Sequence, residues 1–135
     1  ERIFNALDFS YEGSVREKWE HGKNLIFACN NLADFNKDGM YEFGEIIGLK
    51  ISFAPGEPMA TVVVCYDAKD KKLEAVYKQG DVILNRTTLC GKIGKSNFFY
   101  IERTRVPLDS NAGSCTVEVY LGDKKIGSMK LAIKR

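Results

Sequence analysis

Near its C-terminus the chain reads Cys115-Thr-Val-Glu-Val-Tyr-Leu-Gly-Asp-Lys-Lys-Ile-Gly-Ser-Met-Lys-Leu-Ala-Ile-Lys134. Apolar and polar residues alternate on both sides of Gly122-Asp123, which is the period of a half-buried β-strand. A glycine in the first position of a two-residue connection suits a type II′ hairpin turn. The stretch therefore predicts two antiparallel strands, with Val117 and Val119 on the face that is turned to the core.

The same texture extends back to residue 24, as short apolar or β-branched runs separated by polar breaks such as Pro55-Gly56. Seven or more short strands without a long helical period are typical of a β-sandwich or a barrel. The predicted strands are Asn24–Cys29, Ile47–Phe53, Ala60–Tyr66, Leu73–Lys78, Asp81–Leu84, Asn97–Val106, Cys115–Leu121 and Ser128–Lys134.

The predicted domain organisation follows from the position at which these strand-like runs begin. We expect one β-sandwich domain over 24–135, and 1–23 as an N-terminal segment that can pack on it. Within that segment, residues 7–11 alternate in polarity and suggest a short strand. Ser14–Glu20 has the spacing of a capping box and suggests a single helical turn.

The C-terminal stretch also resembles the closing hairpin of immunoglobulin-like modules in bacterial surface proteins. This resemblance covers about the last 20 to 40 residues and implies an immunoglobulin-like β-sandwich. The single tryptophan, Trp19, does not lie between two cysteines, which departs from antibody-type domains.

A candidate metal site lies in Asp34-Phe-Asn-Lys-Asp-Gly-Met-Tyr-Glu-Phe-Gly-Glu45, which fits D-x-[DN]-x-[DN]-G-x₅-E at every defined position. Ca²⁺ is a hard cation that binds six to eight oxygen atoms. Side chains at alternate positions can direct oxygens inward, and the central glycine permits a sharp turn. The predicted ligands are Asp34, Asn36, Asp38, the backbone carbonyl of Met40, the bidentate carboxylate of Glu45 and, through a water molecule, Glu42.

The alternative to a metal site is a polar turn with Asx-type hydrogen bonds. Four acidic side chains within twelve residues would repel one another without a cation, which favours the metal site. The loop resembles that of EF-hand proteins, but an EF-hand needs a helix on each side. Here Leu25–Cys29 and Ile46–Phe53 have strand-like flanking patterns. We therefore expect a structural Ca²⁺ between β elements, bound with an affinity on the order of 10⁻⁴ M, as in extracellular modules. Such a site would work outside cells, where Ca²⁺ is abundant, and therefore favours an exported protein that is extracellular, at the cell surface or periplasmic.

The four cysteines, Cys29, Cys65, Cys90 and Cys115, form no zinc pattern with the single histidine. They are either buried thiols or two disulfides. An exported calcium protein favours disulfides. Cys65 and Cys115 have about the separation of the inter-sheet bridge in immunoglobulin-like folds, which would leave Cys29 to pair with Cys90. The two other connectivities, or none, stay open.

Composition narrows the function classes further. A net charge of +2 predicts no nucleic-acid partner, and no apolar run approaches the length of a membrane span, which predicts no membrane insertion. The chain begins at Glu1 without an initiator Met, as a mature form or an excised fragment would. Phe98–Tyr100 could form an aromatic platform or part of the core.

Together these features predict a calcium-binding, non-enzymatic module that mediates contact with an unknown protein or glycan partner. The alternatives are a carbohydrate-binding module of a secreted enzyme and a purely structural spacer domain. A catalytic triad has no support, because His21 has no glycine-flanked serine to serve.

Overall fold

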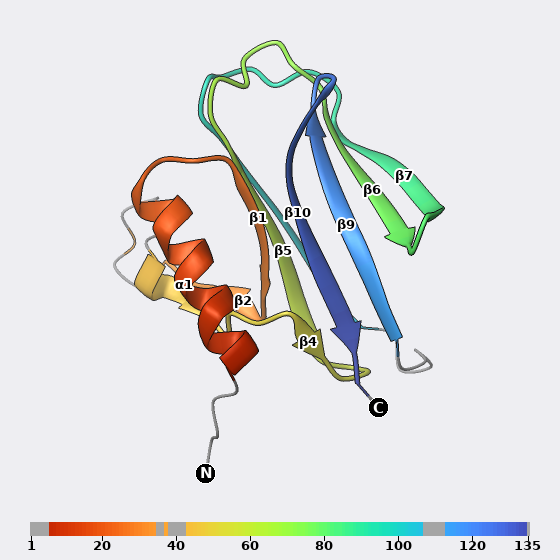
Figure 1. The fold of residues 1–135 in the computed structure, drawn as a ribbon. Helices are drawn as coiled ribbons and strands as arrows, with labels where there is room; N and C mark the ends of the chain where they lie inside the picture. Colours follow the sequence, from red (N-terminus) through yellow and green to blue (C-terminus); the bar gives the residue numbers. More distant parts are fainter. Residues whose placement is uncertain (1–5, 35–36, 38–42, 107–112, 135) are drawn as a thin grey trace.

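The structure is a computed structural model that describes residues 6–34, 37, 43–106 and 113–134 (Figure 1). Most of these residues belong to strands, and one α-helix precedes them. The elements in chain order are α1 (Ala6–Glu20), β1 (Leu25–Cys29), β2 (Asn31–Leu32), the 3₁₀ turn η1 (Phe43–Glu45), β3 (Ile46–Ile47), β4 (Ser52–Phe53), β5 (Pro58–Cys65), β6 (Leu73–Gln79), β7 (Val82–Cys90), β8 (Phe98–Arg105), β9 (Gly113–Leu121) and β10 (Lys124–Ile133).

The strands form two main sheets. One has the order β1-β5-β8, and the other has the order β4-β10-β9-β6-β7. Neighbours are antiparallel except β4 and β10, which are parallel. The predicted C-terminal hairpin is confirmed, since Leu121 pairs with Lys124 and Gly122 has a φ of 61°. An all-β domain is thus the observed architecture, apart from α1.

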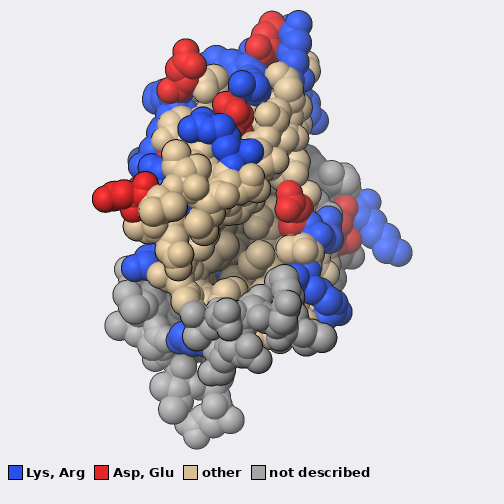
Figure 2. Space-filling model, turned by 90° about the vertical axis from the view of Figure 1, so that its right-hand side faces the viewer, with Lys and Arg blue, Asp and Glu red and all other residues tan. Residues whose placement is uncertain are grey.

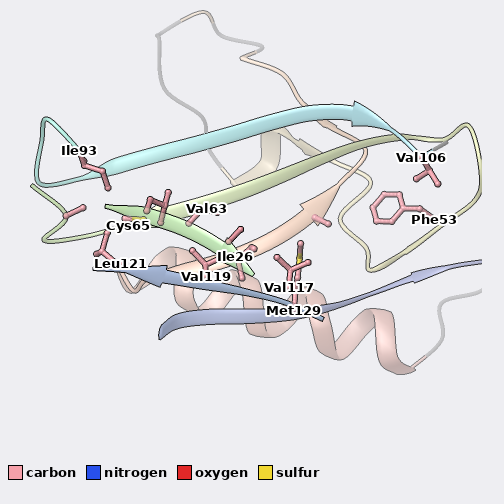
Figure 3. Close-up of a cluster of buried hydrophobic side chains, with 14 residues drawn as sticks. Ile26, Phe53, Val63, Cys65, Ile93, Val106, Val117, Val119, Leu121 and Met129 are labelled. Carbon is pink, nitrogen blue, oxygen red and sulfur yellow. The ribbon is translucent and has the colours of Figure 1, made fainter. Parts of the chain in front are cut away.

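The main core lies between these two sheets (Figure 3). β9 contributes alternate residues to it, because successive strand side chains point to opposite faces. Val117 and Val119 are at most 1% exposed, and they face Ile26 and Val63 of the other sheet within one cluster. Burying each such side chain contributes about 1.5–3 kcal/mol to folding. The core face predicted for β9 is confirmed.

A second cluster covers the outer face of β1-β5-β8, beneath α1 (Figure 1). Val15 of the helix is buried there, and the Trp19 ring meets Phe27 at 6.0 Å and Phe99 at 5.8 Å in edge-on contacts. β1 is therefore buried on both faces, which explains why Leu25–Cys29 is continuously apolar. The molecule has three layers: helix, three-stranded sheet and five-stranded sheet.

Two sequence predictions about local structure are wrong. Residues 7–11 belong to a 15-residue helix, α1, and do not form a strand. Alternation over five residues is too short to exclude a helix, and most helical stability comes from tertiary packing. The stretch 47–53 is also not one strand: β3 ends at Ile47 and β4 begins at Ser52. Gly48 breaks it with a φ of 65°, so β3 pairs with β2 and β4 joins the other sheet.

Candidate metal centre

β2 and β3 close the base of the candidate calcium loop. Asn31 pairs with Ile47 and Leu32 pairs with Ile46 in an antiparallel register. Just inside this pair, the Ala33 N–H donates to the Glu45 carbonyl at 3.1 Å. This bond brings together the backbone at Asp34 and Glu45, the first and last predicted ligands, although they are eleven residues apart in the chain. The described elements flanking the loop are thus short strands and a 3₁₀ turn.

The two described ends of the loop have distinct surroundings. The Lys37 N–H donates to the Asp34 carbonyl at 3.2 Å, and Lys37 has a φ of 56°. At the other end, η1 places Glu45 where only 6% of it is exposed. Glutamates are almost never that buried without a partner. Glu45 is thus enclosed by the fold, whereas Asp34 is only partly buried.

The remaining predicted ligands, Asn36, Asp38, Met40 and Glu42, lie outside the described residues. Among the residues that the structure does describe, no group of three or more His, Cys, Asp or Glu side chains is placed to hold a metal ion. The described geometry that bears on the site is consequently the closed loop base.

Contacts between Asn30 and Gly48 fix the backbone at the base of the loop. The Asn30 N–H donates to the carbonyls of Ile47 at 2.9 Å and of Gly48 at 3.1 Å. Its side-chain Nδ2 donates to Glu57 Oε2 at 2.8 Å and to the Pro58 carbonyl at 2.9 Å. A Cβ at Gly48 would lie 2.0 Å from Asn30 Oδ1, so only glycine fits. The glycine at position 48 is visible in the sequence, but the residue that requires it, Asn30, lies 18 positions earlier and has no local pattern in common with it.

Glu57, Lys50 and Arg103 form polar contacts near the same loop base. Burial alone would raise the pKa of Glu57, but hydrogen bonds from Lys50, Ala54 and Asn30 lower the pKa below its ordinary 4.5. Lys50 forms the ion pair with Glu57. From β8, Arg103 donates to Asn31 Oδ1 at 3.1 Å and to the Leu32 carbonyl at 3.3 Å. These contacts tie β2 to the main sheet.

The helix reaches the exit of the loop through aromatic contacts. The Trp19 ring lies 6.3 Å from the Phe43 ring, and the Arg16 guanidinium lies 4.9 Å from the centre of the Phe43 ring. A cation over an aromatic face is worth about 0.5–1 kcal/mol at an exposed site. Sequence reasoning missed this role of Trp19, because no local pattern links a helix to a residue 24 positions later.

Of the alternatives that the sequence leaves open, the structure has the one in which all four cysteines are free thiols. Cys29 packs in the cluster beneath α1, whereas Cys90 packs against the cluster between the sheets, so a sheet separates them. Cys65 lies at the Leu121 end of the sandwich (Figure 3), six residues along β9 from Cys115. Six strand residues span about 20 Å, and a disulfide needs Cα atoms within about 7 Å.

Burial also makes two of these thiols unreactive. Burial raises the pKa of Cys29 to about 12 and that of Cys65 to about 11. Because the thiolate is the nucleophile, both thiols stay protonated and inert near neutral pH. The interpretation of these two residues as small buried hydrophobes therefore holds.

The aromatic residues 98–100, His21 and the surface lysines and arginines are further candidates for a functional site. Phe98 and Tyr100 pack against the core between the sheets, and Phe99 packs beneath α1, so these three rings do not form an outward platform. The His21 ring donates one hydrogen bond from Nδ1 to the Glu17 carbonyl, 2.8 Å away at the end of α1. On the face in Figure 2, basic side chains lie interspersed with acidic ones rather than in one basic stripe.

Comparisons with known proteins place no family name on the chain. No family model matches it, and no curated protein matches it. A Niemann-Pick type C2 protein from the Japanese carpenter ant is 15% identical over 83% of this chain and 93% of its own, with a TM-score of 0.45. An immunoglobulin-like protein from Pseudomonas aeruginosa is 10% identical over 83% of this chain and 90% of its own, also with a TM-score of 0.45.

A third similar structure is an alkylpurine DNA glycosylase from Pseudomonas fluorescens bound to DNA with an abasic site analogue. It is 11% identical over 96% of this chain and 36% of its own, with a TM-score of 0.40. At these identities and TM-scores the three structures carry no functional argument. No helix in the described part of the chain is long and apolar enough to cross a membrane.

Proposed function

We propose that this chain is a non-enzymatic, immunoglobulin-like module of an exported protein, and that one Ca²⁺ ion bound at 34–45 stiffens its loop. The hydrogen bond between Ala33 and Glu45 is the observation that carries the proposal. It brings the backbone at the first and twelfth positions of the motif close together, which supports a single binding loop. Side-chain oxygens of Asp34, Asn36, Asp38 and Glu45, with the Met40 carbonyl, would hold the ion.

The role of the ion in this proposal is structural. A sensor EF-hand works by opening a pair of helices, and the described flanks here are β2, η1 and β3. Asn30, Gly48 and Arg103 already hold the loop base rigidly. Ca²⁺ at about ten times its dissociation constant would add about 1.4 kcal/mol to the free energy of unfolding. The stiffened loop would then contact a protein or glycan partner on an exposed surface.

The test compares calcium titrations of two matched double variants. We expect calorimetry on the unaltered protein to give one site, with a dissociation constant on the order of 10⁻⁴ M. Asp34→Asn with Glu45→Gln should abolish both this heat and the calcium-dependent rise in melting temperature. Asp81→Asn with Asp123→Asn removes two exposed carboxylates elsewhere and should leave both unchanged.

The calcium-dependent change, rather than the melting temperature itself, is the readout, because Glu45→Gln alters a buried side chain. Absence of binding at millimolar Ca²⁺ would refute the proposal, as would equal losses in the two double variants. A calcium-dependent shift produced equally well by Mg²⁺ would point to general screening of the acidic loop instead.

A further inference from the structure

A cavity of about 230 Å³ opens where α1 crosses the edges of both sheets. β1 is the edge strand of its sheet, and β10 pairs with β4 only at Ala132 and Ile133, so their free edges face each other. At one point the two strands nearly touch, because a Cβ on Gly127 would lie 3.3 Å from Ile26 Cγ2. Ser14, Val15 and Lys18 of α1 line the cavity together with residues of these two strands.

The cavity has two chemically different zones. Its walls are apolar and come from four segments of the chain. They are formed by Val15 of α1, Leu25 and Ile26 of β1, Ile51 before β4, and Met129 of β10. Its rim is polar and cationic, with Ser14 and Lys18 on α1 and Ser128 and Lys130 on β10. An apolar interior with a few polar groups at the opening is the usual form of a small-molecule site.

The charge on this rim is uncompensated within the described residues. Neither Lys18 nor Lys130 forms an ion pair there, and the carboxylates that flank Lys18 on the helix are engaged elsewhere. Glu17 pairs with Lys23 at 3.6 Å, and Glu20 pairs with Arg16 at 3.0 Å. Two lysines from different elements that line one cavity attract an anion and disfavour a cation.

We propose that this cavity binds a small anionic amphiphile, with its headgroup between Lys18 and Lys130 and its apolar part against Ile26 and Met129. At about 30 Å³ per water molecule of liquid volume, 230 Å³ corresponds to roughly eight heavy atoms. A six-carbon carboxylate has that size. A ligand this small has a dissociation constant on the order of 0.1–1 mM. The site uses no residue of 34–45 and is independent of calcium.

The experiment titrates the ¹⁵N-labelled protein with hexanoate, hexan-1-ol and hexylammonium and follows amide chemical shifts. Hexanoate should shift the amides of Ile26 and Met129 in a saturable way, and it should bind at least tenfold more tightly than hexylammonium. Hexan-1-ol should bind weakly at the same amides, because it keeps the apolar contact and loses the charge. Raising the salt concentration should weaken hexanoate alone.

Two double variants separate the lysine rim from the general charge of the protein. Lys18→Gln with Lys130→Gln should raise the hexanoate dissociation constant at least tenfold and leave hexan-1-ol unchanged. Lys124→Gln with Lys134→Gln removes two other exposed lysines and should change neither. All four side chains are exposed, so the fold is expected to tolerate both changes.

Three outcomes would overturn the proposal. The first is the absence of a saturable amide shift with hexanoate at about 10 mM, a concentration well above the expected dissociation constant. The second is an equal loss of hexanoate binding in both double variants, which would mean non-specific charge attraction. The third is sedimentation with phosphatidylglycerol vesicles that depends on Lys18 and Lys130 without saturable hexanoate binding, which would make the rim a membrane contact.

Discussion

Glu118 is expected to be the strongest single electrostatic contributor to stability among the described residues. It lies on the outer face of β9 with 11% of its side chain exposed. Lys78 Nζ lies 3.0 Å from Oε1, Lys125 Nζ lies 3.2 Å from Oε2, and the Tyr120 hydroxyl donates to Oε1 at 3.1 Å. The hydrogen bond from Lys78 contributes most, and together these contacts lower the pKa of Glu118 from 4.5 to about 2.

The magnitude follows from linkage. A pKa lowered by about 2.5 corresponds to about 3.4 kcal/mol of stability at neutral pH. Because Lys125 is half exposed, solvent screening makes this an upper bound, and Glu118→Gln should cost about 2 kcal/mol. A lowered pKa stabilises the fold above the unfolded value of 4.5, and this stability is lost as the pH falls towards 2. At pH 3 less than half of it should remain.

Urea unfolding of the unaltered protein and of Glu118→Gln, at pH 7 and at pH 3, measures both quantities. Glu20→Gln is the matched control, because its ion pair with Arg16 is more than half exposed and should be worth less than about 0.5 kcal/mol at either pH. The reasoning is refuted if Glu118→Gln costs the same at pH 7 and pH 3, or no more than Glu20→Gln does.

Two further predictions concern the loop base and the helix. Gly48→Ala should destabilise the fold by more than about 2 kcal/mol in urea unfolding, because the new Cβ would meet Asn30. Gly80 has a similar φ but lies in open space, so Gly80→Ala is the control and should cost about 1 kcal/mol. Equal costs for the two variants would contradict the steric argument. Trp19→Ala should cost about 2–4 kcal/mol and Trp19→Phe about half of that, because the ring covers Phe27 and Phe99. A cost below 1 kcal/mol for Trp19→Ala by circular dichroism would show that the helix does not depend on this contact.

Much of the sandwich could be predicted from local patterns. Alternation in 115–121 and 128–134 places one set of side chains in the core, because the strand period of two is a property of the backbone itself. The Gly122-Asp123 turn sets the register of that hairpin. At the loop, the strand-like pattern of Leu25–Cys29 matches β1, whereas the pairing of the short β2 with β3 was not predicted.

The failures share one physical cause, which is that each depended on contacts between distant residues. The helix at 6–20 gains its packing from β1, β5 and β8, so its own residues predict it poorly. The cysteine spacing suggested a bridge between Cys65 and Cys115, but spacing along a chain does not say at which end of a strand a residue lies. The break at Gly48 reflects hydrogen bonds from Asn30.

The sequence by itself determined the strand periodicity and the turn at Gly122, because these depend on the geometry of neighbouring residues, and it supplied the motif at 34–45 on which the proposed calcium site rests. Only the tertiary structure decided that a sheet separates Cys29 from Cys90, that Trp19 covers one sheet and that Lys18 and Lys130 share the rim of one cavity. Those pairs are far apart in the chain, and the packing of the helix and the two sheets brings them together or separates them.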